Sequence, residues 1–178
     1  MFVSSRATYK AMAAREDNIW LKLSAGNLEE VRAALQAGGD PNTRGGLDNK
    51  TCLMWAIIRG NEEMVDVLLE QPSIEVNAKD NDENTALHWA CRCGRVSNVA
   101  ILNQLLAAPG ILVNERDSDG WTPIMLAIYS EAVRVMAVRV MAAVEEVDLD
   151  VSHNGRSLED LAHRRAKYDV LCLLWLSM

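Results

Sequence analysis

A His-x-x-Cys-x-Cys motif, formed by His88, Cys91 and Cys93, is the group of residues with the most evident chemistry in this sequence. Imidazole and thiolate are both zinc ligands, so the motif raises the hypothesis of a metal site. On a helix, however, His88 and Cys91 share a face while Cys93 points away, and no fourth ligand lies nearby in the sequence. We therefore expect that this motif binds no metal and no other cofactor.

A cysteine nucleophile with a histidine base is the enzymatic alternative, and the histidines and cysteines are few enough to inspect singly. They are His88, His153, His163, Cys52, Cys91, Cys93 and Cys172. The chain has no Gly-x-Ser-x-Gly, no glycine-rich phosphate loop and no His-Glu-x-x-His. The sequence predicts a protein without catalytic residues, with an enzyme or metal-binding domain as the alternative.

Composition narrows the class of protein further. The chain has 178 residues, 49% of them hydrophobic, which is enough for one domain with a sizeable core. The net charge of −7 argues against nonspecific nucleic-acid binding, which needs cations against phosphate. No signal peptide and no apolar run of membrane-spanning length is visible. The cysteine spacing is not that of a secreted disulfide framework, so we expect an intracellular protein, cytoplasmic or nuclear.

The chain repeats itself at a spacing typical of helical solenoids. Four similar segments begin at Thr51, Thr85, Thr122 and Ser157, separated by 34, 37 and 35 residues. Each unit contains a short helix, a tight turn, a longer amphipathic helix and a polar loop. The Thr or Ser is expected to cap the first helix, and Gly60 and Gly94 to end it. A second signal recurs in phase at Asn42, Asn77, Asn114 and Asp150.

These units resemble the ankyrin repeat family. The motifs are Thr-x-Leu-His-x-Ala at Thr85–Ala90, Thr-Pro-Ile-Met-x-Ala at Thr122–Ala127, and Val-Asn ahead of the polar loops. The resemblance implies an all-α solenoid of helix-turn-helix repeats with projecting β-hairpin-like loops. It divides the chain into an extension at 1–15, an N-terminal capping repeat at 16–46, a repeat at 47–80, a repeat with an insertion at 81–117, a degenerate repeat at 118–150 and a C-terminal capping repeat at 151–178.

Several positions depart from the family pattern. Met54 and Met125 replace the motif histidine, and Asn49 and Glu83 replace the loop glycine, so we expect distorted loop tips there. Extra residues near 98–104 are expected to lengthen or bulge the second helix of that repeat. Glu131 replaces a turn glycine, so the helix there is expected to run on.

The resemblance also assigns roles to core residues. It implies that His88 bonds backbone of the next repeat, and that Trp55 and Trp89 are largely buried between helices near each other. Leu53, Ala56, Leu87 and Ala90 are predicted to be core residues, and Trp20 and Trp175 to seal the two ends.

The family binds partners with its loop tips and the exposed face of the first helices. We therefore predict a partner protein or peptide in the concave groove, held by a set of accessible aromatic, arginine and loop residues. These are Arg59, Asn81, Asp82, Arg92, Asp119, Trp121 and Tyr129. Matching positions that could extend the set are Leu47, Asp48, Lys50, Ile58, Asn84, Cys93, Ser118, Ser130, His153, Asn154, Arg156, Arg164 and Arg165.

Two questions about that surface stay open in the sequence. Trp121 either forms an interface hot spot or packs on a neighbouring loop. Arg59, Arg92 and Arg164 or Arg165 either form a basic stripe for an acidic partner or pair with loop carboxylates. The expected function is a protein-binding scaffold or adaptor module. It is expected to be a monomer, the alternative being a dimer through the apolar segment 170–176.

Overall fold

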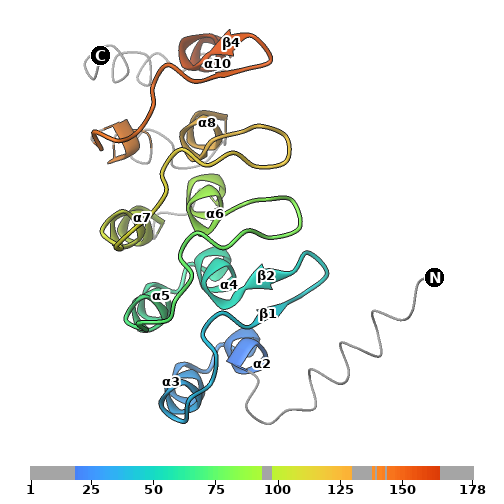
Figure 1. Ribbon diagram of the computed structural model, residues 1–178, viewed down its shortest axis with the longest axis vertical. Coiled ribbons are helices and arrows are strands. Elements are labelled where there is room, and N and C mark those ends of the chain that lie inside the picture. Colours follow the sequence, from blue (N-terminus) through green and yellow to red (C-terminus); the bar gives the residue numbers. More distant parts are fainter. Residues whose placement is uncertain (1–18, 94–97, 130–137, 139, 143, 165–178) are drawn as a thin grey trace, which may run out of the picture.

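The computed structural model describes residues 19–93, 98–129, 138, 140–142 and 144–164, and these form a solenoid of helix pairs in two layers (Figure 1). The layer of first helices consists of α2 (Ile19–Ser24), α4 (Cys52–Arg59), α6 (Ala86–Arg92), α8 (Pro123–Tyr129) and α10 (Leu158–Arg164). The layer of second helices includes α3 (Leu28–Gln36), α5 (Glu62–Leu69) and α7 (Asn98–Leu106). Successive helices contact each other within each layer, and α3, α5 and α7 each contact their own first helix. Within the described ranges, every helix is too short or too polar to cross a membrane.

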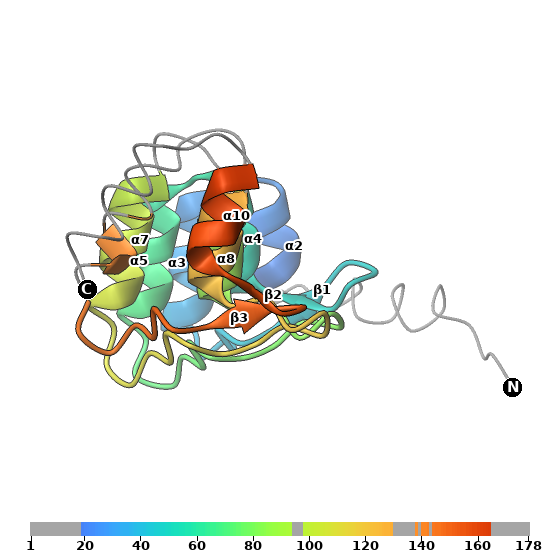
Figure 2. The ribbon, with the colours of Figure 1, turned by 90° about the horizontal axis from the view of Figure 1, so that it is seen from above.

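Polar loops, which we call fingers, precede the first helices of the repeats. In the finger before α4, β1 (Arg44–Gly45) pairs antiparallel with β2 (Lys50–Thr51). In the finger before α10, β3 (Ser152–His153) pairs antiparallel with β4 (Arg156–Ser157). Viewed along the stack, the fingers project together from one end of the first helices (Figure 2). The predicted all-α solenoid with hairpin-like loops is therefore confirmed.

The predicted helix starts are also confirmed, and most of the predicted caps. The side-chain oxygens of Thr51, Thr85 and Ser157 accept from the backbone N–H three residues on, at 3.2, 3.5 and 3.2 Å. The hydroxyl of Thr122 has no hydrogen-bond partner in the described part of the chain, so this predicted cap is wrong. Helix α8 begins instead on Pro123, whose fixed φ suits the first helical position. Gly60 ends α4 in the left-handed region, as predicted, whereas Gly94 and Glu131 lie outside the described residues.

The core lies between the two helix layers and continues from repeat to repeat. Leu53, Ala56, Leu87 and Ala90 are all at most 3% exposed, which confirms their assignment. Alanine at the helix contacts lets the backbones approach closely, so the small side chain is part of the packing. Trp55 and Trp89 pack on this core and are largely buried, as predicted, although each keeps part of its surface exposed.

A ladder of asparagine side chains joins successive repeats on the side where second helices lead into fingers. The amide group of Asn42 donates to Ser73 O (2.7 Å) and accepts from Glu75 N (2.8 Å). Asn77 makes the same two bonds to the next loop: its amide donates to Gly110 O and accepts from Leu112 N. Asn114 in turn donates to Glu146 O and accepts from Asp148 N. Both ends of each amide are therefore used, which explains why this residue type recurs in phase.

Residues 94–97, which separate α6 from α7 in the sequence, lie outside the described residues. The described part of α7 has nine residues, against nine in α3 and eight in α5. The expected lengthening or bulging of this second helix therefore stays a prediction.

The finger tips keep their turn geometry without glycine. Asn49 and Glu83 adopt φ of 57° and 59°, close to the left-handed values that glycine adopts, and Gly120 has φ of 83° at the equivalent place. The expected distortion of these tips is therefore wrong, because the side chains enter the left-handed region and the turn is retained. Asparagine tolerates this region, but for glutamate it carries a cost of about 1–2 kcal/mol.

Glu83→Gly is therefore expected to raise the free energy of unfolding by about 1 kcal/mol, since glycine adopts a positive φ freely. Urea denaturation followed by circular dichroism measures the change. Glu83→Ala is the matched control, because it removes the same carboxylate and its 3.7 Å contact with Lys79 but keeps the Cβ. Equal stability of the glycine and alanine variants would show that the backbone at Glu83 is not strained.

Candidate partner-binding face

His88 links α6 to the next finger, as the family resemblance implied. Its Nδ1 accepts the Thr85 backbone N–H (3.1 Å), so the ring proton is on Nε2, which donates to Trp121 O (3.0 Å). Burial is the main cause that lowers the pKa of His88 from its usual 6.5, against a smaller opposing effect of the Trp121 carbonyl. Both ring nitrogens are engaged in structural bonds, which leaves neither for a metal ion or for proton transfer.

The cysteines of the motif are arranged for packing. Burial raises the pKa of Cys91, and likewise that of Cys52, to about 12, so both thiols are protonated at neutral pH. A protonated thiol is a poor nucleophile and a poor metal ligand. Cys93 lies at the end of α6 and is partly exposed. Among the described residues, no group of three or more His, Cys, Asp or Glu side chains could hold a metal ion.

A cation lies over each of the partly exposed indoles of the first helices. The Arg59 guanidinium is 5.3 Å from the Trp55 ring centroid, and the Arg92 guanidinium is 5.5 Å from that of Trp89. The two arginines are not at equivalent positions, since Arg59 follows its tryptophan by four residues and Arg92 by three. Both spacings place the two side chains on one helix face, so the arrangement is the same in both repeats. The ring of Trp55 also contacts that of Trp20, with centroids 6.0 Å apart.

Trp89 is anchored by residues of two fingers that sequence reasoning did not assign to it. Its Nε1 donates to Asp80 Oδ2 at 2.8 Å, and Lys50 of the preceding finger lies 4.7 Å above its ring. Lys50 itself is buried and pairs with Asp48. The only sequence signal for this contact is that Lys50 directly precedes the capping Thr51, the position that Trp121 holds before Thr122.

Trp121 lies along α8 and contacts two other aromatic groups. Its ring centroid is 5.1 Å from that of Tyr129 and 4.3 Å from that of His153, with which it is stacked. Its indole is partly buried, whereas Tyr129 at the end of α8 is 47% exposed. Trp121 therefore packs on a neighbouring finger and keeps part of its surface accessible, so the packing role is confirmed and the hot-spot role stays a prediction.

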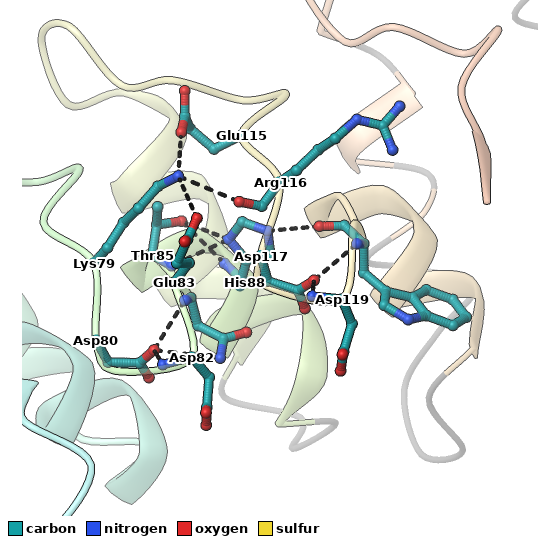
Figure 3. A network of polar contacts seen from close by, with 12 residues as sticks. Lys79, Asp80, Asp82, Glu83, Thr85, His88, Glu115, Arg116, Asp117 and Asp119 are labelled. Atoms are coloured by element: carbon teal, nitrogen blue, oxygen red, sulfur yellow. Dashed lines mark hydrogen bonds and ion pairs between the residues drawn. The ribbon is translucent and has the colours of Figure 1, made fainter. Parts of the chain in front are cut away.

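The predicted finger residues fall into two kinds (Figure 3). Asn81 is held in place, because its backbone N–H donates to Asp48 O (3.0 Å) and its side chain to Leu47 O (3.2 Å) of the preceding finger. The carboxyl groups of Asp82 and Asp119 are exposed and point to the same side of their fingers. Some predicted positions lie outside the described residues, namely Ser130, the side chain of Arg164, Arg165, Trp175 and the segment 170–176.

Comparison with known proteins agrees with this architecture. The family model described as "Ankyrin repeats (3 copies)" matches residues 19–117, which is more than half of the chain. The protein therefore belongs to the ankyrin repeat family.

Several curated relatives share this region. An ankyrin repeat-containing protein of Schizosaccharomyces pombe is 33% identical over 94 residues, which are 53% of this chain and 39% of that protein. The human 26S proteasome non-ATPase regulatory subunit 10 is 40% identical over 62 residues, 35% of this chain and 25% of the subunit. A putative palmitoyltransferase of Danio rerio is 29% identical over 124 residues, 70% of this chain and 18% of that protein. The matches thus span less than half the length of each of these relatives.

His88→Met is expected to lower the free energy of unfolding by about 1 kcal/mol at pH 7.5, because the bond to Trp121 O is lost. Methionine is tolerated at this position, because two other repeats already carry it there. The sulfurs of Met54 and Met125 accept the backbone N–H of Thr51 and Thr122, just as Nδ1 of His88 accepts that of Thr85. Thermal unfolding of the two proteins measures the difference.

The same pair of proteins is expected to differ in pH dependence. Because the folded-state pKa of His88 is below 6.5, the unfolded chain takes up the proton first as the pH falls. His88 thus contributes stability that is present above pH 6.5 and is lost below it, down to the folded pKa. Between pH 7.5 and pH 5.5 the native protein should lose more stability than His88→Met. Parallel curves for the two proteins would contradict the assigned neutral, buried imidazole.

Proposed function

We propose that this protein is a protein-binding module, of the scaffold or adaptor kind, that holds a partner against its first helices and fingers. The contact residues are those predicted from the sequence: Arg59, Asn81, Asp82, Arg92, Asp119, Trp121 and Tyr129. The proposal includes the repeat boundaries given above and a monomer in the cytoplasm or nucleus. It includes no catalytic role, cofactor, nucleic acid or membrane contact.

The observation that carries the proposal is a row of partly exposed aromatic side chains along one face of the stack. Trp55, Trp89 and Trp121 come from three successive repeats, and each ring is covered at one end by an arginine or another aromatic group. Tryptophan, tyrosine and arginine are the residue types that dominate binding energy at protein interfaces. Each of the three tryptophans keeps part of its surface accessible to a partner.

Membership of the ankyrin repeat family supports the same function, because ankyrin repeats bind other proteins. A relative is named as a regulatory subunit of the 26S proteasome, which is a component of a multiprotein assembly. Self-association through the apolar segment 170–176 is the alternative. Sedimentation velocity distinguishes the two, since the module is expected to remain a monomer in the absence of partner.

Trp121→Ala is expected to weaken binding of a captured partner by roughly thirtyfold, corresponding to about 2 kcal/mol for a hot-spot tryptophan. The partner is captured with the native chain, and its Kd for each variant is then measured by isothermal titration calorimetry. The backbone of Trp121, which bonds His88 and Asp117, is unchanged in this variant, so the finger is expected to remain folded.

Glu62→Ala is the control, because Glu62 is exposed on α5, in the layer of second helices. Its Kd should equal that of the native chain. A partner whose binding depends on Glu62 and not on Trp121 would place the interface on the second helices and contradict the proposal.

A further inference from the structure

Charge is unevenly distributed over the first helices of this acidic protein. The helices α2, α4, α6 and α8 contain no aspartate or glutamate, although the chain has a net charge of −7. Their charged residues are Lys22, Arg59 and Arg92, each in the last turn of its helix. The helix dipole favours cations at these ends, and the result is a basic edge along the stack.

The fingers carry the opposite charge at one recurrent position, three residues before Thr51, Thr85 and Thr122. This position is occupied by Asp48, Asp82 and Asp119 in successive fingers. The carboxylate of Asp48 pairs with Lys50, which lies over the Trp89 ring. The carboxylates of Asp82 and Asp119 have no hydrogen-bond or ion-pair partner among the residues that the structure describes. They point to the same side of adjacent fingers (Figure 3).

The other finger carboxylates are already used within the protein. Asp80 Oδ1 accepts from two backbone N–H groups and its Oδ2 from Trp89, and Asp117 Oδ1 accepts from the backbone N–H of Asp119 and Trp121. Lys79 contacts both Glu115 (2.8 Å) and Glu83 (3.7 Å). Asp82 and Asp119 are therefore the carboxylates left to form an acidic edge on these two fingers.

The aromatic row lies between the two edges. Helices α4 and α6 each begin at a finger and end at an arginine, whereas α8 ends at Tyr129, so the two edges are separated by at least the length of a seven-residue helix such as α6, about 10 Å. Trp89 spans this distance, because its Nε1 bonds Asp80 of the finger while Arg92 lies over its ring. The face thus has an acidic edge, an aromatic floor and a basic edge, and is wide enough for one polypeptide segment.

We propose that the partner is a charge-polarised segment that lies along the stack, with a basic edge against Asp82 and Asp119 and an acidic edge against Arg59 and Arg92. Apolar side chains between its two edges pack on the tryptophans. A wholly acidic peptide would meet repulsion at the fingers, and a wholly basic peptide would meet it at the helix ends. This inference rests on the proposed function and specifies the partner's chemistry.

The test uses random dodecapeptides displayed on phage and selected on the 178-residue chain. Peptides whose binding is lost in Trp121→Ala are synthesised, and their Kd is measured by fluorescence anisotropy. We expect these peptides to contain both acidic and basic residues. We expect both double variants, Arg59→Glu/Arg92→Glu and Asp82→Lys/Asp119→Lys, to weaken binding about tenfold or more. Reversing the acidic residues of the peptide should restore binding to the first variant only, and reversing the basic residues should restore it to the second only.

The control Glu62→Lys/Glu63→Lys changes the net charge as much as the finger variant does, on the exposed side of α5, and should leave the Kd unchanged. Circular dichroism of each variant checks that it is folded. Two outcomes would overturn the charge-polarised partner: peptides that depend on Trp121 but carry charge of one sign, and peptides whose binding changes in only one of the double variants. Neither outcome would contradict the proposed binding face. A selection that yields no peptide dependent on Trp121 would count against the proposed function itself.

Discussion

The bond from each asparagine side chain to the loop of the next repeat is the constraint on which the rest of this structure depends. Asn42, Asn77 and Asn114 each satisfy one N–H and one C=O of the following repeat, in a polar layer where those groups have no strand partner. The two short bonds set the distance and direction from one repeat to the next. With that distance set, the helices stack in register, the fingers lie side by side, and the indoles of successive repeats form a row.

Much of this fold was predictable because its signals are local and repeated. The helix starts follow from a Thr or Ser at a fixed spacing, and the roles of His88 and Ala90 follow from the motif Thr-x-Leu-His-x-Ala of their own repeat. The predictions that failed concern local conformations that contacts with the rest of the protein decide. Glu83 enters the left-handed region because the bonds of its finger outweigh its own preference.

The candidate site was predictable in composition and less so in geometry. The aromatic and arginine residues could be selected from sequence because they occupy the positions with which the family binds. The partial exposure of Trp55 and Trp89 could not, since how much of an indole at a helix contact is covered depends on how far apart the helices lie. Lys50 and Asp80 were missed for a different reason. They act on Trp89 from two separate fingers, and no local pattern connects them.

The replacement of the motif histidine by methionine in two repeats has a consequence for cooperativity. In a linear array, stability is approximately a sum of terms within repeats and coupling terms between neighbours. His88 adds a polar bond between α6 and the finger of the next repeat, whereas Met54 and Met125 only contact backbone within their own repeat. Coupling is therefore strongest at the junction that bears Trp121, and weaker on either side of it. The repeats that bear Trp89 and Trp121 should behave as one unit in hydrogen exchange, with partial opening beginning beyond them, so these two indoles would stay together in states where the ends of the stack have opened.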